Sequence, residues 1–192
     1  MKKLLITMFL LALTGCVSVV KMESGVQTLG SRMVVKLDGA WNHVSAPFLG
    51  PAQFWTMEGL PVDQMLIYTD VKDGETVHTG GTGASGKLKE FKFRSGMQPD
   101  EIVAMFEGML TRDGSSFKLI KLEPSTFGGD KGFRFEYSLI RKGDNVQLSG
   151  IGHATVNKGE LFAILYIAPR MTFFSRHKDR VEEIARSARV KA

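Results

Sequence analysis

The sequence predicts an α+β domain in which helices pack on an antiparallel β-sheet. Residues 133–167 contain two alternating apolar segments and a nearly continuous apolar run, separated by two short polar turns, the pattern of an antiparallel meander. Residues 99–112 and 172–189 instead repeat apolar side chains at helical spacing. Because strands, a helix, strands and a helix follow one another along the chain, we expect one sheet flanked by two main helices.

The chain opens with a leader of the export type. Lys2 and Lys3 precede an almost wholly apolar run over residues 4–13. About ten residues cannot cross a hydrocarbon core roughly 30 Å thick, so this run is too short for a membrane-spanning helix. A positive start, an apolar centre and small residues at the end are typical of a signal peptide, which we assign to residues 1–15.

The end of the leader, Leu13-Thr14-Gly15-Cys16, resembles the lipobox of bacterial lipoproteins, and Cys16 is the only cysteine in the chain. The resemblance implies cleavage between Gly15 and Cys16, attachment of diacylglycerol to the Cys16 sulfur, and acylation of the new amino terminus by a chain such as palmitate. Val17 stands where inner-membrane lipoproteins of Gram-negative bacteria carry Asp. The resemblance therefore implies an outer-membrane lipoprotein facing the periplasm. The alternative is an ordinary signal peptide that is cleaved near a buried cysteine.

Cleavage would leave 192 − 15 = 177 residues, a length that suits one domain. Lys2 and Lys3 would be lost, so the net charge of +5 would fall to +3, a mild excess that gives no reason to expect nucleic-acid binding. With Cys16 acylated, no disulfide can form, and stability must come from apolar packing. We expect residues 16–32 to be a lipidated tether with an early strand, and residues 33–192 to be a single globular domain.

The first half of the domain should contain short strands and one irregular segment. Residues 33–37 and 65–71 are predicted strands, and Asp73-Gly74 predicts a hairpin turn from which residues 75–79 return. Residues 88–94 alternate like a further strand. Residues 41–61 contain three prolines and both tryptophans. This segment also holds a cluster of aromatic and apolar side chains: Trp41, Phe48, Phe54, Trp55 and Met57. The cluster is either exposed as an interaction surface or buried by a loop that closes over the sheet, and we favour the buried arrangement.

The first predicted helix has clear signals at its start, whereas the second is recognised by its apolar face. Pro99 suits the first helical position, and the two acidic residues after it favour the positive end of the helix dipole. Residues 117–122 then form a strand that ends at Pro124, before the meander. In the meander, Gly150 and Gly152 share one face of the middle strand and leave room for a bulky occupant, for which we expect the closing helix. The apolar face of that helix comprises Phe174, His177, Val181, Ile184, Ala185 and Ala188.

A glycine-rich stretch from Gly80 to Gly86 resembles a nucleotide-binding motif, because Gly81, Gly83 and Gly86 match the pattern G-x-G-x-x-G. That motif needs a helix to start within it, and a P-loop needs Ser or Thr after its lysine. The following residues alternate like a strand, and Leu88 follows Lys87. We therefore interpret the stretch as a loop and expect no cofactor.

The four histidines, His43, His78, His153 and His177, show no helical metal-site spacing, and no cysteine ligand is available, so no metal is expected. We expect His177 to be a half-buried packing residue, whereas His153 could face either the core or solvent. A Ser-His-Asp set can be assembled from Ser149, His153 and Asp144, but no nucleophile elbow accompanies it. The basic residues after Arg176 are interspersed with acids, which favours a solvated helix face over a membrane contact.

The order of Trp41, Phe54-Trp55-Thr56 and Asp73-Gly74, followed by a mid-chain helix, a meander and a closing helix, is similar to the PsbP-like fold. The resemblance implies an α/β/α sandwich, and members of this fold serve mostly as accessory, assembly or binding proteins. It carries over no functional residue. We expect a non-catalytic, lipid-anchored envelope lipoprotein that binds or helps to assemble another envelope component. The alternative is a small-ligand-binding or hydrolytic domain in which residues 80–86 cover a site near His78 or His153.

Overall fold

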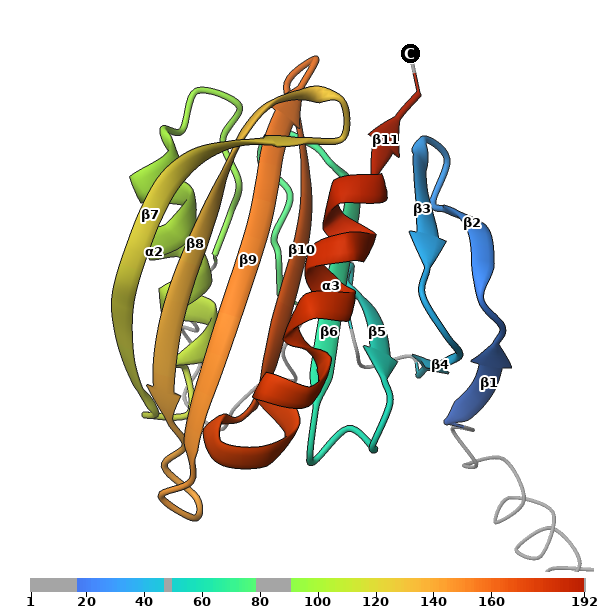
Figure 1. Cartoon of the computed structure of the whole chain (residues 1–192). Helices are drawn as coiled ribbons and strands as arrows, with labels where there is room; N and C mark the ends of the chain where they lie inside the picture. Colours follow the sequence, from blue (N-terminus) through green and yellow to red (C-terminus); the bar gives the residue numbers. More distant parts are fainter. Residues whose placement is uncertain (1–16, 47–49, 79–90, 192) are drawn as a thin grey trace, which may run out of the picture.

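The computed structural model of the protein describes residues 17–46, 50–78 and 91–191. Its centre is an antiparallel sheet of eight strands (Figure 1). In spatial order these are β1 (Ser18–Met22), β4 (Trp41–Ser45), β5 (Gln53–Thr56), β6 (Gln64–Val71), β10 (Glu160–Pro169), β9 (Gln147–Asn157), β8 (Asp130–Ile140) and β7 (Ser116–Phe127). A smaller antiparallel sheet has the order β11 (Arg189–Val190), β3 (Met33–Leu37), β2 (Gly25–Leu29). Helix α2 (Pro99–Leu110), the π-helical turn η1 (Arg170–Phe174) and helix α3 (Ser175–Ser187) complete the described fold.

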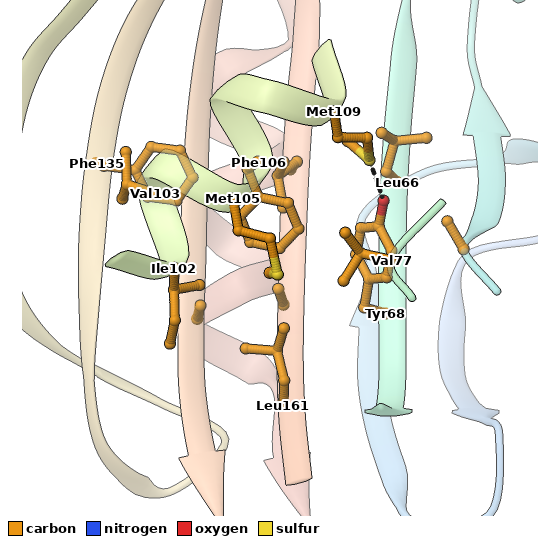
Figure 2. Close-up of a cluster of buried hydrophobic side chains, with 14 of the residues drawn as sticks. Leu66, Tyr68, Val77, Ile102, Val103, Met105, Phe106, Met109, Phe135 and Leu161 are labelled. Carbon is orange, nitrogen blue, oxygen red and sulfur yellow. Dashed lines mark hydrogen bonds between the residues drawn. The ribbon is translucent and has the colours of Figure 1, made fainter. Parts of the chain in front are cut away.

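One face of the large sheet is covered by α2. The sequence gives this helix a start at Pro99 and an acidic first turn, and the Glu101 carboxylate accepts a hydrogen bond from the backbone N–H of Gln98 (2.8 Å). Its buried side chains pack on aromatic rings of the sheet (Figure 2). The ring of Phe106 lies 5.4 Å from that of Tyr68 and 6.4 Å from that of Phe135. The predicted apolar stripe of this helix is thus confirmed.

The opposite face of the sheet is covered by α3 and the three-stranded sheet (Figure 1). Both tryptophans belong to this second core, with Trp41 and Trp55 almost completely buried. Val181, Ile184 and Ala185 supply the buried face of α3. The large sheet therefore has an apolar core on each face, and the expectation that the Pro-rich segment buries its tryptophans is correct. Phe48 lies outside the described residues.

The predicted meander is confirmed as β8, β9 and β10, and β7 adds a fourth consecutive strand. β7 continues to Phe127, beyond the predicted end at Pro124. β7 is the edge strand of the sheet, which is where a proline is tolerated within a strand. The pairing also shifts between Leu119 and Lys121, a bulge of the kind that protects sheet edges.

The expectation that the closing helix covers the face of Gly150 and Gly152 is wrong. These glycines lie opposite Tyr137 and Phe135 on β8, and an added Cβ at either position would stand 2.2 Å from an atom of the facing ring. The aromatic rings of the neighbouring strand therefore lie over the glycines on the face that α2 covers. The closing helix α3 packs on the other face, because the buried residues of β9 that it meets, such as Ile151, have the opposite parity.

Three further expectations differ from the structure. The sequence predicts a tether with an early strand over residues 16–32, but Ser18–Met22 and Gly25–Leu29 form two paired strands, β1 and β2, so the ordered fold begins before residue 33. The turn after Val71 forms, with the N–H of Glu75 donating to the carbonyl of Lys72, but residues 75–77 do not return onto β6. They pair instead with residues 91–93 through one bridge, Thr76 to Lys92, so neither predicted strand there is regular.

The closing helix is shorter than the predicted 172–189. The chain enters it through the π-helical turn η1, and α3 ends at Ser187. Arg189 and Val190 pair with β3 instead. The N–H of Val190 also donates a hydrogen bond to the carbonyl of Gly128, which follows β7. Within the described residues, no helix combines the length and the apolar composition needed to cross a membrane.

Candidate functional site

The loop between β5 and β6 is organised by a buried aspartate. Asp63 has no exposed surface, and its carboxylate accepts hydrogen bonds from the Thr56 hydroxyl and from the backbone N–H groups of Met57 and Glu58. The Thr56 hydroxyl in turn accepts the N–H of Gly59 (2.8 Å). A buried carboxylate is tolerated when it is fully hydrogen-bonded in this way. The consequence is a fixed direction for the neighbouring Glu58 side chain.

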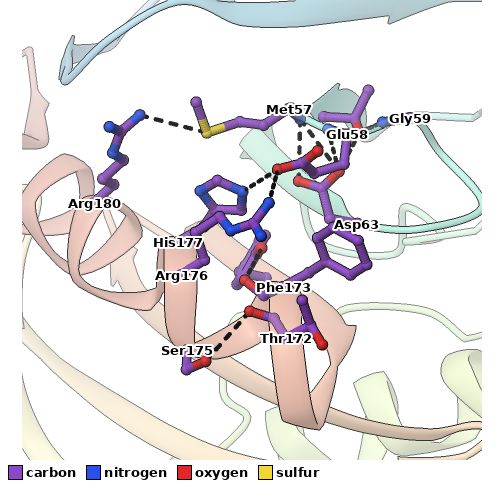
Figure 3. Close-up of polar contacts among 12 residues, drawn as sticks. Met57, Glu58, Gly59, Asp63, Thr172, Phe173, Ser175, Arg176, His177 and Arg180 are labelled. Atoms are coloured by element: carbon purple, nitrogen blue, oxygen red, sulfur yellow. Dashed lines mark hydrogen bonds and ion pairs between the residues drawn. The ribbon is translucent and has the colours of Figure 1, made fainter.

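Glu58 joins this loop to the start of α3 (Figure 3). Its Oε1 lies 2.8 Å from Nε2 of the buried His177 and 3.0 Å from Nη1 of Arg176. The hydrogen bonds from His177 and then Arg176 hold the pKa of the Glu58 carboxyl below its ordinary value. His177 is therefore more deeply buried than the half-buried packing residue expected from the sequence, and its Nε2 contacts the Glu58 carboxylate.

The turn η1 presents an apolar side chain next to this ion pair. The ring of Phe174 stacks on that of Tyr166 (6.0 Å), and the Tyr166 hydroxyl donates to the carbonyl of Phe173 (3.4 Å). The Arg176 guanidinium lies 5.2 Å from the centre of the Phe173 ring. Met171, on the same turn, is 87% exposed. We call this set, Met171, Phe173 and Arg176 with Glu58, the η1 corner. π-Helical turns are uncommon and are frequent at functional sites.

A second charged cluster lies between α3 and the sheet. The Glu182 carboxylate has one oxygen 2.6 Å from Nη2 of Arg134 and the other 2.9 Å from Nε2 of His153. Arg134 also contacts Glu123 and Glu136. Burial opposes ionisation of Glu182, but the contacts with His153 and Arg134 outweigh it and lower the pKa of this carboxyl to about 2. His153 therefore faces the helix-covered core, where its partner is a carboxylate from α3.

A small hollow opens at the end of the sheet where β8 and β9 are joined. Its volume is about 140 Å³, below the roughly 300 Å³ at which small-molecule sites usually begin. Apolar side chains including Leu110, Leu139 and Ile167 line it, with Asp113 and Arg141 as charged members. Arg141 is paired with Asp144 (2.7 Å) and donates a hydrogen bond to the carbonyl of Pro61 (3.1 Å).

Most sequence-predicted site residues fall into two groups. Gly15, Cys16 and the stretch from Gly80 to Gly86 lie outside the described residues. Ser149, His153 and Asp144 are described but form no triad: His153 meets Glu182, Asp144 pairs with Arg141, and Ser149 is four residues from His153 along a strand, about 13 Å away. Within residues 17–46, 50–78 and 91–191, no group of three or more His, Cys, Asp or Glu side chains is arranged to hold a metal ion.

Sequence reasoning did not single out the carboxylates that organise these clusters. Glu58 and His177 are 119 positions apart, and Arg134 and Glu182 are 48 apart. A lone acidic residue in a loop carries no local signal for so distant a partner. The one usable signal was His177 on the apolar face of a predicted helix, because a buried histidine there needs a polar partner.

No protein-family model matches the chain, and no curated protein is similar to it in sequence. Among solved structures, the chain is similar to the solution structure of cyanobacterial PsbP (CyanoP) from Synechocystis sp. PCC 6803, with a TM-score of 0.57. The similarity covers 93% of this chain and 96% of that chain at 15% sequence identity. At this identity the likeness concerns the fold alone. The element order, the central antiparallel sheet and this neighbour together establish that the chain has a PsbP-like α+β fold.

Proposed function

We propose that the protein is a non-catalytic, lipid-anchored accessory module of the cell envelope, tethered through Cys16 to the periplasmic face of the outer membrane. In this proposal it binds another envelope protein or helps to assemble it. The lipobox supports the tether. The η1 corner supports the binding role and is the observation on which this part of the proposal rests.

The η1 corner has the composition and the rigidity of a contact surface. Met, Phe and Arg are enriched in protein interfaces, and here they lie together on one turn and the first residues of a helix. Stacking on Tyr166 and the ion pair with Glu58 fix the turn before a partner arrives. A preorganised surface loses less conformational entropy on binding, so a small contact can contribute more affinity.

The experiment is a crosslinked pull-down from intact cells with three matched proteins: the wild type, Cys16→Ser and Met171→Glu. We expect a partner that is recovered with the wild type and lost or strongly reduced with both variants. Ile120→Glu is the control, because Ile120 is also exposed (59%) but lies in the bulge of β7. Equal recovery by all four proteins, or recovery of abundant neighbours alone, would contradict the accessory role.

The alternative is a small-ligand-binding or hydrolytic domain in which residues 80–86 cover a site near His78 or His153; the hollow lined by Leu110, Leu139 and Ile167 is smaller than such sites usually are. For a site at His153, His153→Ala should abolish activity without lowering the melting temperature. Because His153 is buried against Glu182, we expect the substitution to lower the melting temperature instead. A stable but inactive His153→Ala protein would favour the alternative.

A further inference from the structure

The first strand of the fold lies next to the proposed anchor. This inference rests on the proposed lipidation of Cys16. β1 begins at Ser18, so only Val17 lies between the acylated cysteine and a strand that is paired with β4, and Ser18 is two residues along the chain from Cys16. Two residues span at most about 7 Å of extended chain. A domain anchored at Cys16 therefore cannot move its β1 edge far from the headgroups of the bilayer.

The residues nearest the anchor are unusually apolar for a surface. Val17, Val19 and Val20, next to and on β1, and Val26, at the start of β2, are between 52% and 70% exposed, and we call these four the valine surface. They make up four of the eight large apolar side chains that are exposed in the described structure. Scattered exposed apolar residues need no explanation, but their concentration within ten residues of chain does.

The geometry of β1 explains why these side chains have no cover. β1 is the edge strand of the large sheet, and its only strand neighbour there is β4. Val19 and Val20 are consecutive, so they point to opposite faces of the sheet, yet both are exposed. Only Met22, at the end of the strand, packs against the core beneath α3. Both faces of the anchor-proximal part of β1 are therefore open.

The charges around the valine surface suit lipid headgroups. The first acidic residue after the anchor is Glu23, which is paired with Lys21 (2.8 Å). Lys36 on β3 lies directly opposite Val26 in the small sheet and is exposed. Lysine beside exposed apolar residues is the composition of surfaces that lie in the interface of anionic membranes.

We propose that the valine surface rests in the headgroup region of the membrane that carries the lipid anchor, so that the β1 edge faces the bilayer and the β7 edge faces away. The occupant is the lipid surface rather than a second protein, because the covalent anchor holds it within reach at all times. Lipid contact would also cover an open strand edge that could otherwise pair with another chain. The η1 corner belongs to other elements and stays available to a partner.

The test uses the full-length protein, lipidated in cells and reconstituted into vesicles of phosphatidylethanolamine and phosphatidylglycerol. Acylation blocks Cys16, the only native cysteine, so a single introduced cysteine can carry a fluorophore. Val20→Cys and Val26→Cys report on the valine surface. Ile120→Cys is the matched control, since it is similarly exposed but lies on the edge strand at the other end of the sheet (Figure 1).

Headgroup-attached nitroxide lipids then quench fluorophores that lie near the bilayer surface. Because β1 and β7 are separated by seven strand spacings, about 30 Å, we expect quenching at positions 20 and 26 to be at least about twofold stronger than at position 120. Circular dichroism checks that each variant is folded. Equal quenching at all three positions, or stronger quenching at position 120, would overturn the proposed orientation.

Two further outcomes separate this inference from the proposed function. If the mass of the amino-terminal peptide carries no lipid, the proposed anchoring and this inference both fail. If the lipid is present but positions 20 and 26 are protected from nitroxide and crosslink between two copies, the anchor is correct and the valine surface is a protein interface, which overturns the inference alone.

Discussion

Replacing Glu182 by Gln should destabilise the domain, because this carboxylate connects α3 to the sheet. One of its oxygens contacts Arg134 and the other contacts His153, at 2.6 and 2.9 Å. Its side chain retains 18% of its exposure. Glutamine keeps the shape but removes the charge that balances the half-buried Arg134 guanidinium.

The magnitude follows from the pKa of the Glu182 carboxyl. Lowering it from the ordinary 4.5 to about 2 corresponds to roughly 3 kcal/mol at about 1.4 kcal/mol per pKa unit. Some solvent still reaches the carboxylate, and Arg134 keeps its contacts with Glu123 and Glu136, which reduces the loss. We therefore expect Glu182→Gln to lower the free energy of unfolding at pH 7 by about 2 kcal/mol.

The same argument predicts how the stabilisation by Glu182 changes with pH. A lowered carboxyl pKa stabilises the fold above the pKa of the unfolded chain, about 4.5, and this stabilisation is lost as the pH falls toward 2. The difference in unfolding free energy between wild type and Glu182→Gln should therefore shrink by about half between pH 7 and pH 3.

Urea unfolding followed by circular dichroism at both pH values measures this difference. Glu183→Gln is the matched control: Glu183 is the next residue on α3, is 59% exposed and is paired with Arg186. We expect it to change stability by less than about 0.5 kcal/mol. Equal losses for the two variants, or a gap between wild type and Glu182→Gln that does not shrink at pH 3, would refute the reasoning.

Two other substitutions test the packing and the loop. Gly152→Ala places a Cβ against the Phe135 ring and should lower the free energy of unfolding in urea by about 1–3 kcal/mol. Gly143→Ala is the control, because nothing lies within 4 Å of its added Cβ, and it should be nearly neutral. Equal effects of the two substitutions would contradict the ring placement. Asp63→Asn turns one acceptor of the β5–β6 loop into a donor and should lower the melting temperature by about 2–6 °C in calorimetry. The exposed Asp38→Asn is its control, and a Tm unchanged in Asp63→Asn would show that the loop is held by other contacts.

The sequence was informative where local patterns decide the structure. Alternation of apolar and polar residues located β8 and β9, and a nearly continuous apolar run after a short turn located β10. Pro99 and the acidic residues after it located the start of α2. Burial of Trp41 and Trp55 could also be expected, because large aromatic side chains stabilise a core when they are enclosed.

Long-range pairings could not be read from the sequence. Nothing local distinguishes a closing helix from the rings of Phe135 and Tyr137 as the cover over Gly150 and Gly152. The exposed valines of β1 carry no apolar-polar alternation, so the sequence predicts a tether with an early strand rather than two paired strands, β1 and β2. The Glu58–His177 and Arg134–Glu182 pairs depend on how α3 crosses the sheet, which only the folded structure specifies.

The most direct test of the account is the mass of the amino-terminal peptide of the protein extracted from membranes. The account predicts a peptide that begins at Cys16, lacks residues 1–15 and carries diacylglycerol together with an acyl chain on its amino group. The Cys16→Ser protein, analysed in parallel, should lack both modifications and leave the membrane fraction. A wild-type peptide that begins elsewhere, or one that begins at Cys16 without lipid, would contradict the anchored module and the membrane contact inferred for β1.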